Sequence, residues 1–274
     1  MNHSLTASSP VSKRLSPRKM AFITGTLLLT STGFICRILG FFYRIFMSRT
    51  IGAEGLGIYN MVHPIFSICF AVCAGSIQTA LSQYVAANQT RGRAVFRTGL
   101  VIAMGMSFLL AWVIYGNAGF LAEKLLLEPR CAPYLPVMSV SVPFAALHAC
   151  INGYYYGMQK ARVPAFSQVA EQVIRMGAVF LIASIWLESG RQITVSLAVY
   201  GHLIGEMASA VFTVFCLGFF PPCKDGDSRR APAIPLSFGA TAAPLMALAL
   251  PLMGNRLILN VLGSAEAIWI PNRL

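Results

Sequence analysis

Residues 21–46 have the sequence AFITGTLLLTSTGFICRILGFFYRIF, in which Arg37 and Arg44 are the only charged residues. A helix needs about 20 predominantly apolar residues to cross the hydrocarbon core of a bilayer. This stretch therefore predicts a membrane-spanning helix, and its length argues against a cleaved secretory signal.

Six further segments have the same character. They cover residues 57–86, 97–119, 133–157, 165–187, 193–220 and 236–264. None shows the alternation of a membrane β-barrel, and a backbone exposed to lipid must satisfy its own hydrogen bonds. The fold expected is all-α, a polytopic membrane helix bundle.

The composition of the 274 residues supports a membrane protein. Hydrophobic residues make up 56% and charged residues only 11%, against about 25% charged in soluble domains. The net charge of +12 does not indicate nucleic acid as a partner, because the basic residues lie between apolar segments rather than on one face. The seven cysteines fall mostly within apolar segments and are predicted to be buried hydrophobes. No metal or cofactor is predicted.

The basic residues predict the orientation. One set of alternate loops and the N-terminal tail hold Lys13, Arg14, Arg18, Lys19, Arg91, Arg93, Arg97, Lys160, Arg162, Lys224, Arg229 and Arg230. The opposite loops hold only Arg49, Lys124, Arg130 and Arg191. Because Lys and Arg accumulate in cytoplasmic loops, the N-terminus is predicted to be cytoplasmic in a multi-pass protein of the plasma membrane.

The chain is expected to have four parts. Residues 1–20 form a basic cytoplasmic tail, and residues 21–220 form an N-terminal lobe of six helices. Residues 221–235, rich in Pro, Gly and charges, form a cytoplasmic linker. Residues 236–274 begin a second lobe with a seventh helix, whose arginine echoes the first span, as in transporters built from repeats. We therefore expect a fragment of a longer protein.

Ionisable residues recur at helical spacing inside several spans. Arg37 and Arg44 are seven residues apart, and Glu171 and Arg175 are spaced for an i,i+4 ion pair. Glu206 belongs to a similar polar stripe on the sixth span. Such residues usually face a hydrated cavity, because a charge at the bilayer centre costs about 2.5–3.5 kcal/mol. The alternatives are interhelical hydrogen bonds for the Ser, Thr and His side chains, and snorkelling to the outer interface for Arg44 and Arg49.

The positive net charge expected for the cavity indicates an anionic substrate. Its predicted lining residues are Arg37, Arg44, Arg49, Glu171, Arg175, Glu206 and Arg256. Arginines outnumber carboxylates in this set, and the planar guanidinium fork suits phosphate or pyrophosphate.

Four stretches of sequence carry a resemblance to a known family. They are RILGFFYRI at 37–45, SRTIGAEGLGIYNM at 48–61, GYYYGMQK at 153–160 and NRLILNVLGSAEAIWIPNRL at 255–274. With them the chain resembles the polysaccharide flippase branch of the multidrug, oligosaccharidyl-lipid and polysaccharide exporter superfamily.

This resemblance implies two lobes around a central cavity and alternating access. It also implies a lipid-linked oligosaccharide or peptidoglycan precursor as cargo, in the synthesis of the spore cortex or cell wall. In related lipid II flippases, arginines on the first helix hold the pyrophosphate. Arg37 matches that motif directly, whereas Arg44 is displaced by one residue.

Three other functions are alternatives to a flippase. A cation-coupled multidrug exporter of the same superfamily predicts acidic residues on the first span, which has none. A membrane-embedded enzyme needs clustered carboxylates for a metal, but the closest pair in sequence, Asp225 and Asp227, lies in the predicted linker. A non-catalytic scaffold for cell-wall synthesis enzymes stays open on sequence grounds.

Overall fold

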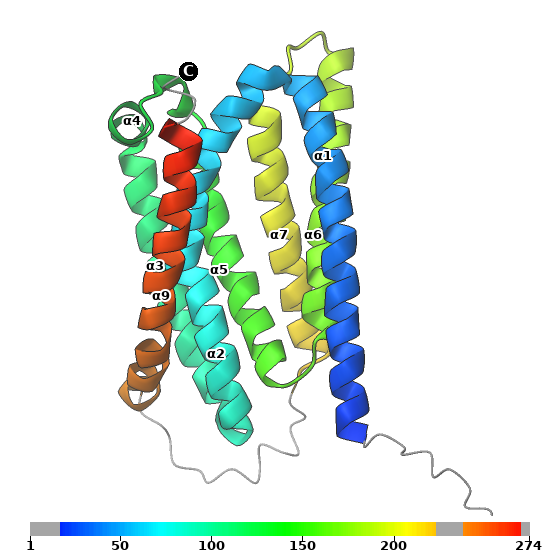
Figure 1. Ribbon diagram of the computed structural model, residues 1–274, viewed down its shortest axis with the longest axis vertical. Coiled ribbons are helices and arrows are strands. Elements are labelled where there is room, and N and C mark those ends of the chain that lie inside the picture. The colour runs from blue at the N-terminus through cyan, green and yellow to red at the C-terminus, as the bar shows by residue number, and fades with distance from the viewer. Residues whose placement is uncertain (1–16, 223–237, 270–274) are drawn as a thin grey trace, which may run out of the picture.

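A computed structural model describes residues 17–222 and 238–269, and every regular element in these ranges is helical. The long helices are α1 (Pro17–Phe70), α2 (Ser76–Ala87), α3 (Gly92–Gly116), α5 (Leu135–Gly157), α6 (Arg162–Glu188), α7 (Ser196–Phe219) and α9 (Phe238–Trp269) (Figure 1). Short helical turns connect them: η1 (Ala71–Gly75), η2 (Gln89–Arg91), α4 (Ala118–Phe120), η3 (Leu121–Leu125) and η4 (Pro129–Cys131). The predicted all-α membrane bundle is confirmed.

Helix α1 reverses direction at Gly52. A straight helix of its 54 residues would be about 80 Å long, far more than the roughly 30 Å of a bilayer core. Gly52 has φ 75° and ψ 174°, a conformation open to glycine because it has no Cβ. The chain goes up the bundle before Gly52 and comes down after it (Figure 1). Gly52 lies within residues 47–56, which separate the first two predicted spans, but helix continues on both sides of this one glycine instead of a loop.

The other predicted spans agree with the structure to within a few residues. Six continuous helical stretches are long and apolar enough to cross a membrane, and the first of them, Ile23–Ala87, contains the reversal at Gly52. Within residues 17–222 and 238–269 the chain thus makes seven passes through the bundle. The turns that carry Arg91 and Lys160 lie at the end where α1 begins (Figure 1). Of the other predicted cytoplasmic charges, Lys13, Arg14, Lys224, Arg229 and Arg230 lie outside the described residues.

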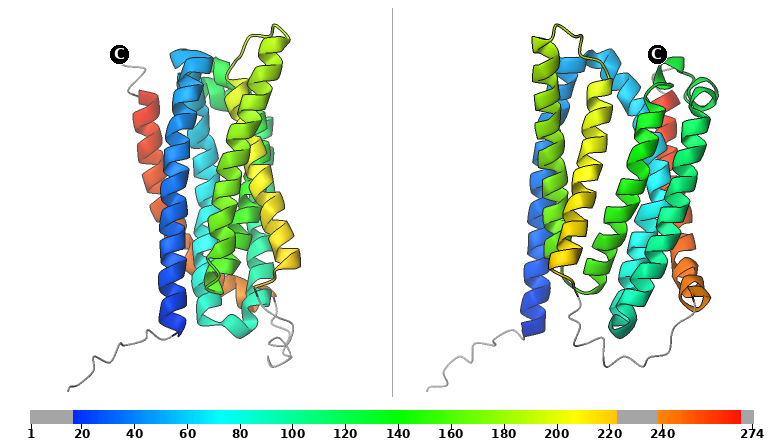
Figure 2. Two further views of the ribbon diagram at one scale, coloured as in Figure 1. Left: turned by 90° about the vertical axis from the view of Figure 1, so that its right-hand side faces the viewer. Right: turned by 180° about the vertical axis from the view of Figure 1, so that it is seen from behind.

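The helices form two packed groups. The large group consists of α2, α3, α5 and α9, which share one apolar core with the second half of α1 and with Val199 of α7. The small group consists of α6, α7 and the first half of α1, around a core of Met47, Val179, Ala183, Leu197 and Ala198. Figure 2 shows the two groups side by side, with α5 and α7 as the neighbouring helices.

Close backbone contact holds the large group together. A Cβ on Gly153 of α5 would lie 2.7 Å from the backbone oxygen of Gln78 on α2. Only glycine permits this approach, which resembles the small-residue contacts of other membrane helices. Helix α9, predicted to begin a second lobe, packs here against α2, and the linker before it lies mostly outside the described residues.

The cysteines behave largely as predicted. Cys69, Cys73, Cys131, Cys150 and Cys216 are free and buried, and Cys36 is partly buried. Cys223 lies outside the described residues. In the part of the chain that the structure describes, these side chains serve as small packing groups.

Candidate functional site

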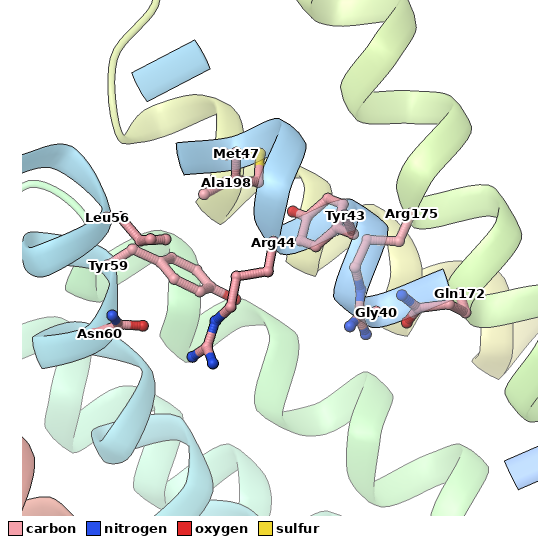
Figure 3. A pocket seen from close by; sticks show the side chains of 10 residues that line it. All are labelled: Gly40, Tyr43, Arg44, Met47, Leu56, Tyr59, Asn60, Gln172, Arg175 and Ala198. Carbon is pink, nitrogen blue, oxygen red and sulfur yellow. The ribbon is translucent and has the colours of Figure 1, made fainter. Parts of the chain in front are cut away.

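A cavity of about 200 Å³ opens between the first half of α1, the segment after Gly52, and helices α6 and α7. Its lining residues are Gly40, Tyr43, Arg44, Met47, Leu56, Tyr59, Asn60, Gln172, Arg175 and Ala198. Arg44 reaches it from α1 and Arg175 from α6 (Figure 3). We call it the arginine cavity, and it unites two of the arginines predicted from the sequence.

Arg175 is charge-compensated within the protein. Its guanidinium forms the predicted i,i+4 ion pair with Glu171 and lies 3.7 Å from a carboxylate oxygen of Glu206 on α7. Its side chain is 16% exposed. A Cβ on Gly205 would lie 2.7 Å from Arg175 Nε, so the glycine lets the guanidinium fit between α6 and α7. Arg175 is thus a buried but compensated cation.

Arg37 and Arg44 have a different environment. Both side chains are exposed, and two helical turns separate them on nearly the same face of α1. Among the residues described, no acidic side chain forms an ion pair with either. Of these two arginines, Arg44 lines the arginine cavity and Arg37 does not. The first helix therefore offers two guanidinium groups whose charge the described structure leaves uncompensated.

Tyr43 adds a hydrogen-bond donor to the arginine cavity. Its hydroxyl is buried and has no hydrogen-bond partner among the described residues. Asn60 and Gln172 line the same space. A buried hydroxyl costs free energy until it finds a partner, so this lining favours a ligand that accepts hydrogen bonds, such as a phosphate.

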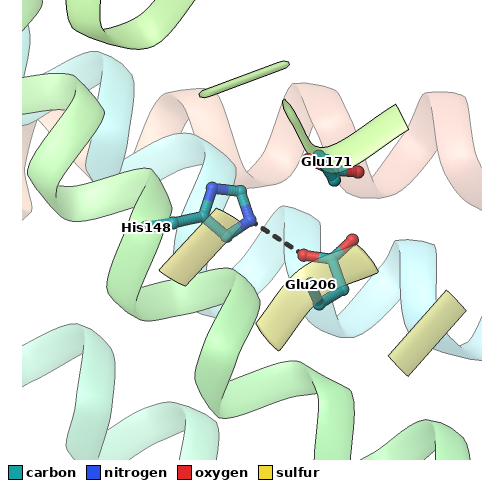
Figure 4. A group of neighbouring side chains, drawn as sticks. All are labelled: His148, Glu171 and Glu206. Carbon is teal, nitrogen blue, oxygen red and sulfur yellow. Dashed lines mark hydrogen bonds and ion pairs between the residues drawn. The ribbon is translucent and has the colours of Figure 1, made fainter. Parts of the chain in front are cut away.

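A second cavity of about 270 Å³ adjoins the first and has acidic character. Glu171 and Glu206 line it together with His148 and Asn152. His148 Nε2 lies 2.8 Å from Glu206 Oε2, within hydrogen-bond distance (Figure 4). The ion pair between Arg175, which lines the arginine cavity, and Glu171 connects the two spaces.

The sequence predicted Glu171 and Glu206 in one cavity with the arginines, but it did not predict their grouping with His148 in a separate acidic cavity. One ligand atom each of His148, Glu171 and Glu206 lies within 4.8 Å of the others, a grouping that could hold a metal ion. The three residues come from α5, α6 and α7, far apart in sequence. Their polar stripes were recognisable, but their meeting depends on tertiary packing. The sequence-neighbouring pair Asp225 and Asp227 lies outside the described residues.

Besides Arg37, two predicted site residues line neither cavity. Arg49 is exposed near the reversal at Gly52, and its spacing of five residues from Arg44 directs it to another face of α1. Arg256 of α9 donates a hydrogen bond from Nη2 to Thr79 Oγ1 at 3.0 Å and packs against Gly75, the last residue of η1. The structure does not bring either residue into the arginine cavity.

A comparison with protein families matches residues 22–273 to the model described as polysaccharide biosynthesis protein. The chain belongs to this family. The resemblance inferred from the sequence is thereby confirmed, and the apolar helices identify a multi-pass membrane protein.

Several curated proteins of Bacillus subtilis (strain 168) are similar to this family member. Stage V sporulation protein B is 29% identical over 262 residues, which cover 93% of this chain and 50% of that protein. The lipid II flippase MurJ is 24% identical over 206 residues, which cover 69% of this chain and 38% of that protein. The sporulation protein YkvU is 18% identical over 192 residues. The chain spans about half the length, or less, of these relatives, and no solved structure matches it.

Proposed function

We propose that the protein is a flippase, which translocates a lipid-linked oligosaccharide or peptidoglycan precursor across the membrane by alternating access. The observation that carries this proposal is the exposed, uncompensated Arg44 beside Arg175 in one cavity within the membrane-spanning bundle. The name of the relative MurJ, a lipid II flippase, supports the class of cargo.

The arginine cavity suits the phosphorylated part of such a cargo. Arginine binds phosphate through parallel hydrogen bonds from its fixed fork, and a charge-assisted bond is about twice as strong as a neutral one. The buried Tyr43 hydroxyl supplies a further donor. Arg37, two turns further from the reversal on nearly the same face of α1, is available to a head group that extends along the helix. The apolar circumference of the bundle leaves the isoprenoid chain in lipid.

The similarity to two sporulation proteins supports a role in spore cortex or cell-wall synthesis. In this role the protein acts as a transporter rather than an enzyme, and cell-wall synthesis enzymes are its expected neighbours. The basic turns at the end where α1 begins support a cytoplasmic N-terminus. We further propose that the helices up to α7 form one lobe of the transporter and that α9 begins a second.

A transport assay tests the proposal. The protein as its gene encodes it is reconstituted into liposomes that contain a fluorescent undecaprenyl-pyrophosphate sugar, and cargo movement is measured from its accessibility to an external quencher. A hydrogen bond to a charged group is worth about 1.5–3 kcal/mol. Arg44→Ala and Arg37→Ala should therefore slow movement at least about tenfold.

Arg191→Ala is the matched control, because Arg191 is an exposed arginine in the turn between α6 and α7. It removes the same charge outside both cavities and should leave transport unchanged. Wild-type rates in both α1 variants would contradict the proposed site. Equal losses in all three variants would show a general charge effect and would also contradict it.

A further inference from the structure

The acidic cavity next to the arginine cavity suggests how cargo binding is coupled to a second ligand. We propose that Glu171, Glu206 and Asn152 form a site for one monovalent cation, and that this cation binds cooperatively with the cargo phosphate by releasing Arg175 from Glu171. The inference rests on the proposed function, because it concerns the same arginine.

The first support is the double role of Arg175. Its guanidinium lines the arginine cavity and at the same time contacts Glu171, which lines the acidic cavity. Glu206 lies 3.7 Å from the same guanidinium. One cation therefore compensates two buried carboxylates in the structure, and a phosphate in the arginine cavity would compete for it.

The second support is a set of buried polar atoms without partners around Glu206. Asn152 is 6% exposed and lines the acidic cavity, and its Oδ1 atom has no hydrogen-bond donor among the described residues. His202 is 2% exposed, and neither of its ring nitrogens has a hydrogen-bond partner there, although Nε2 lies 3.9 Å from Glu206 Oε1. Carboxylate and amide oxygens are the ligands that hard cations prefer, and an amide oxygen can equally accept a hydrogen bond from a protonated carboxyl.

Other titratable and charged groups face this cluster from every neighbouring helix. They are Cys36, Tyr43, Arg44, Tyr59 and His63 on α1, His148 on α5 and His202 on α7. None of them is a carboxylate, so Glu171 and Glu206 carry the negative charge of the cluster. His148 already lies within hydrogen-bond distance of Glu206. Glu171 is therefore the carboxylate that depends most on Arg175.

Charge balance then links the two cavities. If a cargo phosphate draws Arg175 away, Glu171 and Glu206 are left as like charges in a buried position, which is strongly unfavourable. One cation from solution, a proton or Na⁺, restores the balance. Each ligand thereby raises the affinity for the other by the same factor.

A binding experiment tests this coupling. The dissociation constant of farnesyl pyrophosphate is measured for the gene-encoded protein in nanodiscs, in one arm as the pH falls through the neutral range without Na⁺, and in another as Na⁺ rises at constant pH and ionic strength. If the site binds a proton, pyrophosphate should bind about tenfold more tightly as the pH falls, and Na⁺ should have no effect. If the site binds Na⁺, the same increase in affinity should appear as Na⁺ rises. Independence from both cations would overturn the proposal.

The variant Glu171→Gln separates the coupling from the titration of the pyrophosphate itself. Any change in the protonation of the pyrophosphate affects its binding to the wild type and to the variant alike. The amide removes the charge that holds Arg175, so binding should be tight under all conditions and the cation dependence should disappear. Glu188→Gln, at the exposed end of the same helix, should retain the wild-type dependence. A wild-type dependence in Glu171→Gln would overturn the inference.

A measurement without cargo distinguishes this failure from failure of the proposed function. Infrared difference spectra across the same pH or Na⁺ range report the carboxyl groups directly. The wild type should show a carboxyl band that changes with the cation and is missing in Glu171→Gln. If this band is present but pyrophosphate does not bind, the cation site stands and the proposed function fails. If pyrophosphate binds but the band is absent, the cation site fails alone.

Discussion

The large and small helix groups differ in what they bury between their helices. The large group buries apolar side chains from four helices and the second half of α1 in one continuous core, and Gly153 brings α5 directly against α2. The small group has a core of only five fully buried apolar residues. Between its helices lie Arg175, Glu171 and Glu206, whose charges compensate one another.

This difference in buried residues indicates which helix group holds the functional site. Apolar groups in a close-packed core gain dispersion energy in any membrane protein and carry no chemistry. Buried ionisable groups are costly and persist where they bind or move a ligand. The two groups meet at α5 and α7, where His148 from the large group contacts Glu206 from the small group. Changes in the two groups should therefore have different consequences.

The largest effect is expected from Arg175→Ala in the small group. Removing the guanidinium leaves two buried carboxylates uncompensated, and breaking a buried ion pair in this way costs about 3–5 kcal/mol. The variant should melt at a clearly lower temperature in detergent, as measured by the fluorescence of a thiol-reactive dye. Adding Glu171→Gln to it should restore part of the loss, because one of the unpaired charges is gone. Additive losses in the double variant would show that the pair does not interact as the structure indicates.

A smaller effect is expected from Gly153→Ala in the large group. The added methyl group would lie 2.7 Å from a backbone oxygen of Gln78, and such overpacking costs about 1–3 kcal/mol. Stability should fall while pyrophosphate affinity at a saturating cation concentration stays the same, since neither Gly153 nor Gln78 lines the arginine cavity. Gly105→Ala on α3, where a Cβ would meet nothing within 4 Å, is the control and should not destabilise. A loss of affinity in Gly153→Ala with unchanged stability would remove the distinction between the two groups.

The sequence was sufficient to predict the fold because span length and hydropathy are properties of local composition. Seven apolar segments predicted seven passes, and the spacing of Glu171 and Arg175 predicted their ion pair. The reversal after the first pass lies where the predicted spans place it, because Gly52 falls within residues 47–56, but its form was not predicted, since helix continues on both sides of a single glycine with positive φ. Nothing in the hydropathy of residues 47–56 distinguishes a helix interrupted at one residue from a loop.

The site was predictable only in part. The sequence predicted Arg44 and Arg175 as lining residues of one cavity, but the shape of that cavity depends on how α1 packs against α6. The acidic cavity depends on three helices and was not predicted. The absence of acidic residues on the first span was the argument against cation coupling, yet Glu171 and Glu206 lie on α6 and α7. Charge can thus reach the centre of the bundle from helices other than the first.

The central claim is that Arg44 and Arg37 face water and meet an anionic head group. The most direct test replaces each with cysteine, in a background whose native cysteines are changed to alanine, and measures the rate of modification by a charged, membrane-impermeant thiol reagent. Phe42→Cys, on a different face of α1, is the lipid-facing control. The account predicts fast modification at positions 44 and 37, slowed by farnesyl pyrophosphate, and little at position 42. Modification at position 44 as slow as at position 42, or unaffected by pyrophosphate, would contradict it.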